Sequence, residues 1–124
     1  MKTPTGLLVL EEPRDLETYG SILCRLGYRI LMCNSVAGAI EALEAENVSF
    51  VIVSQGSRAF EGRQVLERSL QLHPNAPVLV VARVLDMHCY LEAMDLGASD
   101  YLERPDPEDV LWVLDTQMRR AEAA

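Results

Sequence analysis

The stretch from Phe50 to Gly56, Phe-Val-Ile-Val-Ser-Gln-Gly, decides the fold of this chain. Its four consecutive apolar residues are typical of a strand that is covered on both faces of a sheet, and polar residues and a glycine follow them directly. In an open sheet with helices on both faces, ligands bind beyond the carboxyl ends of the strands. Ser54 therefore occupies the position at which we expect any chemistry of this domain.

Short apolar runs elsewhere predict four more strands, and a helical spacing of apolar residues predicts a helix after each strand. Ser35 and Asp86 are placed to cap helices at their starts, while Gly27 and Gly97 are placed to end them. Strict alternation of five strands with five helices predicts an α/β domain with a single doubly wound parallel sheet. The expected strands cover residues 7–10, 28–33, 49–54, 78–82 and 100–102.

The same spacing predicts which helical side chains face the core. Trp112 does not fall on the inward stripe of the last helix, so we expect it on the surface. The side chains that we expect to face inward are Leu16, Tyr19, Leu23, Leu26, Val36, Ile40, Leu43, Val65, Leu66, Leu70, Leu72, Met87, Tyr90, Leu91, Met94, Val110, Leu111, Leu114 and Met118.

Length and charge exclude several classes of protein. A chain of 124 residues fits one domain, and we take residues 1–124 as that domain, with a core over about residues 6–120. The 11 basic and 19 acidic residues give a net charge of −8, which disfavours direct binding of nucleic acid. No apolar run reaches the roughly 18 residues of a membrane span, and the first residues lack the apolar region of a signal peptide. We therefore expect a cytoplasmic protein that does not insert into membranes.

Three cysteines, Cys24, Cys33 and Cys89, lie far apart in the chain and form no Cys-x-x-Cys motif. An odd number at such spacings indicates neither a disulfide framework nor a zinc site. Cysteine is also among the residue types that are most often buried. We therefore expect buried free thiols.

The order of the elements and three motifs resemble the receiver domain of two-component response regulators. Residues 7–13, Leu-Leu-Val-Leu-Glu-Glu-Pro, are similar to that family's apolar strand ending in an acidic pair. Glu61-Gly62 stands where the family has Asp-Gly, and residues 97–105, Gly-Ala-Ser-Asp-Tyr-Leu-Glu-Arg-Pro, follow its Gly-Ala-x-x-Tyr-x-x-Lys-Pro. The resemblance extends from Leu7 to about Arg120. It implies a flavodoxin-like sheet with the strand order 2-1-3-4-5.

The residues that carry phosphorylation chemistry in that family differ here. The family uses an acidic pair and an acceptor aspartate to hold magnesium, and a hydroxyl residue after the fourth strand and a lysine after the fifth to hold the phosphoryl group. The corresponding positions in this chain carry Glu11 and Glu12, Ser54, Ala82 and Arg104. No aspartate occurs between positions 15 and 86 and the only lysine is at position 2, so no shift of the alignment restores the set.

A serine cannot form the acyl phosphate that an aspartate forms, and it offers no carboxylate oxygen to magnesium. The resemblance thus implies a degenerate receiver, for which we expect no cofactor, no metal ion and no enzyme activity. We expect a phosphorylation-independent module that binds a protein partner or forms a homodimer. Because an arginine beside two carboxylates pairs readily with one of them, we also expect Arg104 to close the crevice through an ion pair with Glu11 or Glu12.

Two other functions of the crevice are possible on sequence grounds. An enzyme with Ser54 as nucleophile would need an adjacent base and an oxyanion hole. The chain has no Gly-x-Ser-x-Gly motif, however, and its two histidines, His73 and His88, lie on or beside predicted helices. The stronger alternative to the interaction module is a sensor of a small ligand or anion, which would use Arg83 and Arg104 near the crevice.

The resemblance implies that partners bind the face formed by the fourth helix, the fifth strand and the fifth helix. Tyr101 corresponds to an aromatic residue that, in the family, changes rotamer when the hydroxyl after the fourth strand moves toward phosphate. Because Ala82 has no hydroxyl, we expect Tyr101 to be either a fixed part of the interface or a partly covered tyrosine. Trp112 is the expected apolar anchor, at or near a contact with a partner or a second copy.

Overall fold

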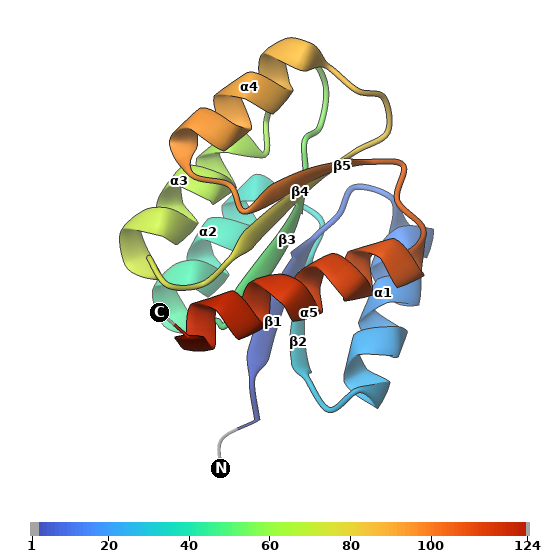
Figure 1. Ribbon diagram of the computed structural model, residues 1–124, viewed down its shortest axis with the longest axis vertical. Helices are drawn as coiled ribbons and strands as arrows, with labels where there is room; N and C mark the ends of the chain where they lie inside the picture. Colours follow the sequence, from blue (N-terminus) through green and yellow to red (C-terminus); the bar gives the residue numbers. More distant parts are fainter. Residues whose placement is uncertain (1–2, 124) are drawn as a thin grey trace.

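Five strands form one parallel sheet in the order β2-β1-β3-β4-β5, as in Figure 1. The computed structural model describes residues 3–123, and the predicted alternation and strand order are confirmed. The strands are β1 (Thr5–Val9), β2 (Arg29–Cys33), β3 (Phe50–Ser54), β4 (Val78–Ala82) and β5 (Asp100–Glu103). The helices are α1 (Pro13–Arg25), α2 (Val36–Ala45), α3 (Arg63–Leu72), α4 (Met87–Leu96) and α5 (Pro107–Ala123). None of these helices is long and apolar enough to cross a membrane.

Local sequence signals begin and end the helices at the expected residues. Ser35 Oγ accepts a hydrogen bond from the amide of Gly38 at 3.1 Å, and Asp86 Oδ1 accepts one from the amide of Cys89 at 3.0 Å. Gly97 ends α4 with a φ of +114°, a conformation that residues with a side chain rarely adopt. The predicted caps of α2 and α4 are therefore confirmed.

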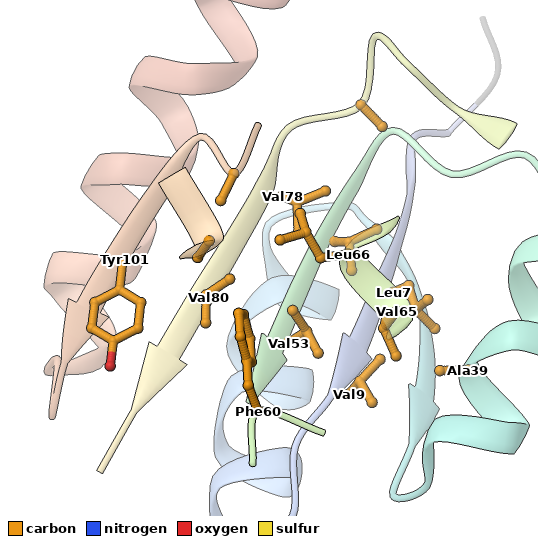
Figure 2. Close-up of a cluster of buried hydrophobic side chains, with 14 of the residues drawn as sticks. Leu7, Val9, Ala39, Val53, Phe60, Val65, Leu66, Val78, Val80 and Tyr101 are labelled. Atoms are coloured by element: carbon orange, nitrogen blue, oxygen red, sulfur yellow. The ribbon is translucent and has the colours of Figure 1, made fainter. Parts of the chain in front are cut away.

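The side chains of the sheet alternate between two cores. Helices α1 and α5 cover one face of the sheet, and α2, α3 and α4 cover the other (Figure 1). In β3, Phe50 and Ile52 belong to the first core, while Val51 and Val53 belong to the second. None of these four side chains is more than 1 % exposed. Figure 2 shows the second core, in which Tyr101 of β5 points its hydroxyl in the direction of the strand arrowheads.

The predicted inward stripe of α4 is wrong for three of its four residues. Met87 and Leu91 are 58 % and 59 % exposed, and Met94 is 37 % exposed. The buried residues of α4 are instead the small Cys89 and Ala93, four positions apart on one face of the helix. Small side chains allow the helix to lie close to the sheet, which turns the larger side chains toward solvent. The prediction from apolar spacing placed the wrong face of α4 against the core because it was based on the large apolar residues.

Two further residues that were expected inward lie at helix ends. Leu26 follows the last residue of α1 and is 60 % exposed, and Leu72 is the last residue of α3 and is 37 % exposed. The helices end at or just before these positions, so the helical spacing no longer predicts which side faces the core.

The three thiols differ in their exposure. Cys89 is buried as expected, Cys33 is partly buried, and Cys24 is exposed on α1, so the expectation of buried thiols is wrong for Cys24. Burial, with a smaller contribution from the charge of Asp86, raises the pKa of the Cys89 thiol from 9.0 to about 11. Burial also raises the pKa of Cys33. Because the thiolate is the reactive form, the structure ranks the three thiols by reactivity.

We predict that iodoacetamide at pH 8 modifies Cys24 rapidly, Cys33 slowly, and Cys89 only after the protein is unfolded in urea. The reason is that Cys24 is exposed to solvent, whereas Cys33 is partly buried and Cys89 is buried. Peptide mass spectrometry over a time course measures the three rates. Cys24→Ser is the matched control and should remove only the fast phase. Rapid modification of Cys89 in the folded protein would contradict the described packing of α4.

Candidate functional site

The predicted crevice lies at the carboxyl ends of β1, β3, β4 and β5. It is a cavity of about 370 Å³ that both acidic and basic side chains line. Three carboxylates and two guanidinium groups are present, so the formal charge of its lining is slightly negative. The lining residues are Leu10, Glu11, Glu12, Asp15, Tyr19, Ser54, Gly56, Val81, Ala82, Arg83, Arg104 and Pro105.

Ser54 is the last residue of β3, and its hydroxyl takes part in the fold. The parallel register of β1 and β3 pairs Val9 with Val53, which brings the chain after β1 beside the end of β3. Ser54 Oγ accepts a hydrogen bond from the backbone amide of Glu11 at 3.3 Å. The hydroxyl therefore helps to hold the β1–α1 loop, in which the acidic pair begins.

No base activates Ser54 within the described residues 3–123. His73 Nε2 lies 2.9 Å from the carbonyl oxygen of Leu43, and His88 Nδ1 lies 3.5 Å from a carboxylate oxygen of Glu92. Both histidines are thus engaged on or beside helices, as expected from the sequence. A nucleophilic serine needs a base within hydrogen-bond reach, so this geometry does not support covalent catalysis by Ser54.

Two glycines let the chain pass close to the end of β3. Gly56 has a φ of +87°, and a Cβ there would lie 2.6 Å from Glu61 Oε1 and 3.3 Å from Glu11 Oε1. A Cβ on Gly62 would lie 2.1 Å from the carbonyl oxygen of Ser54, which is backbone and cannot move aside easily. Gly62 is therefore required where α3 begins beside β3.

Glu61 acts on the loop rather than on the cavity. Its Oε1 accepts hydrogen bonds from the amide of Ser57 at 2.8 Å and from the Ser57 hydroxyl at 2.9 Å. Hydrogen bonds from its own backbone amide and from Ser57 lower the pKa of the Glu61 carboxyl. The ionised carboxylate thus fixes the β3–α3 loop. It lies so close to Gly56 that a side chain at position 56 would clash with it.

The expected ion pair between Arg104 and the acidic pair is wrong. Within residues 3–123, neither Arg104 nor Glu11 nor Glu12 takes part in an ion pair. Arg104 instead donates from Nε to the carbonyl oxygen of Arg83 at 2.7 Å. Its backbone has a φ of +41°, and its amide donates to the carbonyl oxygen of Ala82 at 2.8 Å.

The order of the strands explains why the Arg104 guanidinium donates to the carbonyl oxygen of Arg83. Arg83 follows β4, which is adjacent to β5, whereas the acidic pair follows β1, three strands away. Strands are spaced by roughly 4.8 Å, so the ends of β5 and β1 are about 14 Å apart. A carbonyl on the adjacent strand is the closer partner for the guanidinium.

The residues of the crevice do not fit the magnesium ion that receivers hold. No three carboxylate, imidazole or thiol side chains within residues 3–123 are grouped to bind a metal. Ser54 supplies a hydroxyl where a hard cation would require a third carboxylate, and that hydroxyl already accepts from the amide of Glu11.

Tyr101 is buried, whereas we expected it either as a fixed part of the interface or as a partly covered tyrosine. Its side chain is 7 % exposed and belongs to the core under α4. Its hydroxyl donates to Gln55 Oε1 and accepts from the amide of Asp86 at 3.3 Å. Tyr90 packs edge-on against its ring, with the centroids 5.5 Å apart. Burial raises the pKa of the Tyr101 phenol.

Gln55 is the functional candidate that the sequence did not reveal. It is 4 % exposed, and its side chain reaches from the residue after β3 to Tyr101 on β5. The two residues are 46 positions apart in the chain, and β4 lies between their strands. No local motif marks such a pair, so only the folded arrangement identifies it.

Exposed apolar side chains are concentrated in one segment of the chain. Nine large apolar side chains within residues 3–123 are exposed, and five of them lie between residues 84 and 94. Trp112 is 71 % exposed, opposite the buried residues Val110, Val113 and Leu114 of α5, so its predicted surface position is confirmed. We call the five residues on the β4–α4 loop and α4 the α4 patch: Val84, Leu85, Met87, Leu91 and Met94.

Comparison with known proteins gives relatives over almost the whole chain. No family model matches. The transcriptional regulatory protein KdpE of Mycobacterium tuberculosis is 30 % identical over 119 residues, which are 95 % of this chain and 52 % of KdpE. The chain thus spans about half the length of this curated relative.

Solved structures of similar fold are more distant in sequence. A CheY-like response regulator receiver domain protein from Methanospirillum hungatei superposes with a TM-score of 0.91 at 20 % identity, covering 98 % of both chains. The beryllofluoride-activated NtrC4 receiver domain dimer has a TM-score of 0.83 at 17 % identity, covering 94 % of this chain and 98 % of that one.

We predict that Arg104→Ala lowers the free energy of unfolding by less than about 1 kcal/mol, because the side chain is exposed and forms no ion pair within the described residues. Arg104→Gly should be at least as stable as Arg104→Ala, since glycine adopts the positive φ of this position without strain. Urea denaturation of the three proteins measures both differences. A loss of about 3 kcal/mol or more on Arg104→Ala would instead indicate a buried ion pair.

Proposed function

Because this chain is a receiver domain of response regulators, we propose that it acts in signal transduction without aspartyl phosphorylation. In this proposal it works through contact with a protein partner or with a second copy of itself. The observation that carries the proposal is Ser54. It is the last residue of β3, and its hydroxyl accepts a hydrogen bond from the amide of Glu11. A serine in that place cannot accept a phosphoryl group as an acyl phosphate.

The other residues around Ser54 support the same conclusion. Phosphoryl transfer needs an acceptor, a cation that offsets the charge of the phosphoryl group, and donors where that charge develops. Ala82 at the end of β4 has no donor in its side chain, and Arg104 at the end of β5 is turned to the carbonyl oxygen of Arg83. Glu11 and Glu12 each carry a carboxylate one methylene further from the backbone than aspartate would. Acceptor, cation site and donors are thus all altered together.

The α4 patch and Trp112 support the interaction role. Apolar side chains of this size are exposed singly on most proteins, but several close together mark contact surfaces. Methionine and tryptophan are enriched at protein interfaces, and both occur here. The beryllofluoride-activated NtrC4 receiver domain has been solved as a dimer, so a domain of this fold can self-associate. Tyr101 is not among the contact residues that we propose, because it is buried.

A sensor of a small anion is the second candidate, supported by a cavity of about 370 Å³ beside Arg83 and Arg104. Glu11, Glu12 and Asp15 line the same cavity and would repel an anion. We therefore prefer the interaction module, and a calorimetric titration with inorganic phosphate would reveal a sensor.

We predict that a small-molecule phosphodonor with magnesium leaves the intact mass of the protein unchanged, because no carboxylate occupies position 54. A beryllium fluoride phosphate mimic should likewise leave the amide resonances of Ser54 and Tyr101 in place. A receiver with an acceptor aspartate, treated in parallel, is the positive control. An adduct that hydroxylamine removes would show that the site still accepts phosphate and would overturn the proposal.

The variant Ser54→Asp extends this test. It returns the carboxylate but leaves Ala82 without a donor and removes the hydroxyl that accepts from Glu11. We therefore expect only a small fraction of adduct from this variant. Full phosphorylation would mean that the carboxylate alone was missing.

For the interaction face, we predict that Trp112→Ala and Leu91→Glu each weaken association, whether with a second copy or with a captured partner. Loss of a buried aromatic anchor costs about 2 kcal/mol or more, so the dissociation constant should rise by at least roughly thirtyfold. Leu26→Glu is the matched control, because Leu26 is also exposed but follows α1 and belongs to neither the α4 patch nor α5. Sedimentation equilibrium measures self-association. A strictly monomeric chain whose partner binding is unchanged by Trp112→Ala would refute the role of Trp112.

A further inference from the structure

We propose that Gln55 is an internal lock that keeps Tyr101 buried and thereby holds the β4–α4 loop, which carries part of the α4 patch, in one position. This inference rests on the proposed function and names how its contact surface is kept constant without phosphorylation. It concerns two residues, Gln55 and Tyr101, that come together only in the folded chain.

The first step is the hydrogen-bond balance of the Tyr101 hydroxyl. This hydroxyl donates to Gln55 Oε1 and accepts from the amide of Asp86. Within residues 3–123, Gln55 is its only hydrogen-bond acceptor. Ala82, at the end of β4 between the two strands, offers a methyl group and no hydroxyl. A buried phenol without an acceptor is unfavourable, so the hydrogen bond to Gln55 favours the buried position of the Tyr101 hydroxyl.

The second step is that Gln55 is itself fixed. Its amide donates to the carbonyl oxygen of Val81 at 2.8 Å, and its carbonyl accepts from the amide of Gly62 at 3.1 Å. Its side-chain Nε2 donates to the carbonyl oxygen of Ser57 at 3.3 Å. Because the backbone and the far end of the side chain are both held, Oε1 is presented to Tyr101 in a defined place. A pre-placed acceptor of this kind can act as a lock.

The third step connects Tyr101 to the surface. The same Asp86 whose amide donates to Tyr101 caps α4 by accepting from the amide of Cys89 at 3.0 Å. Next to it, the amide of Leu85 donates to Glu103 of β5 at 2.8 Å. The loop that carries Val84 and Leu85 is therefore attached to β5 at two consecutive amides. Release of Tyr101 removes one of these attachments and leaves the start of α4 less restrained.

The test is amide hydrogen exchange on the isolated full chain, followed by two-dimensional NMR. Gln55→Leu removes the acceptor at similar side-chain volume, and Tyr101→Phe removes the hydroxyl. Each should raise the exchange rate of the Asp86 amide at least tenfold, and the double variant should add little to either single one. Gln55→Glu keeps an oxygen acceptor for Tyr101 but loses the donor to Ser57, so it should protect the Asp86 amide better than Gln55→Leu and less well than the native glutamine. A role of Gln55 confined to its own loop would not change exchange at Asp86, 31 residues away along the chain.

The chain provides a matched control at Gln117, whose side chain donates to the carbonyl oxygen of Ser99 on the other end of the β5 segment. Gln117→Leu should leave the Asp86 amide protected. Tyr101→Phe removes the acceptor of the Asp86 amide directly and therefore sets the upper limit of the effect. If Gln55→Leu does not fold, Gln55→Asn, whose side-chain oxygen is withdrawn from Tyr101 by one methylene, takes its place. Unchanged exchange at Asp86 in the folded variants would overturn the lock. The experiment uses neither phosphate nor a partner, so its failure is distinct from a failure of the proposed function, which would appear as a phosphoryl adduct.

Discussion

The burial of β3 on both faces is the constraint on which the rest of this structure depends. Its four apolar side chains divide between the two cores, and α1 and α5 on one side and α2, α3 and α4 on the other must cover them. Apolar burial of this kind contributes about 25 cal/mol per Å² of surface removed from water, so it is the main force that assembles the two helical layers. Because the sheet is parallel, the same arrangement brings the polar residues after β1, β3, β4 and β5 to one edge.

At that edge the polar groups serve the fold. The Ser54 hydroxyl holds the amide of Glu11, Glu61 holds Ser57, and the Arg104 guanidinium holds the carbonyl oxygen of Arg83. These contacts join successive loops around the crevice. In the function that we propose, a partner or a second copy would contact the exposed apolar residues of α4 and the exposed Trp112.

The face of α4 shows how packing can override a sequence pattern. Large apolar residues recur at helical spacing along this helix, and that spacing alone would bury Met87, Leu91 and Met94. The helix instead buries Cys89 and Ala93 and leaves the larger residues at the surface. The face of α4 that packs on the sheet depends on how closely the helix can approach the sheet. The distance between helix and sheet is set by the packing of both layers.

The sequence by itself determined the alternation of strands and helices, the caps at Ser35 and Asp86, and the lack of a carboxylate at position 54, because each depends on residues close together in the chain. Only the tertiary structure decided what the polar residues of the crevice bind. Ser54 meets an amide 43 positions away, and Gln55 meets Tyr101 at a separation of 46. Arg104 turned to a neighbouring strand and not to the acidic pair, because strand order places β4 beside β5 and β1 three strands away. Partners of this kind follow from sheet order and loop geometry, which local patterns of residues do not contain.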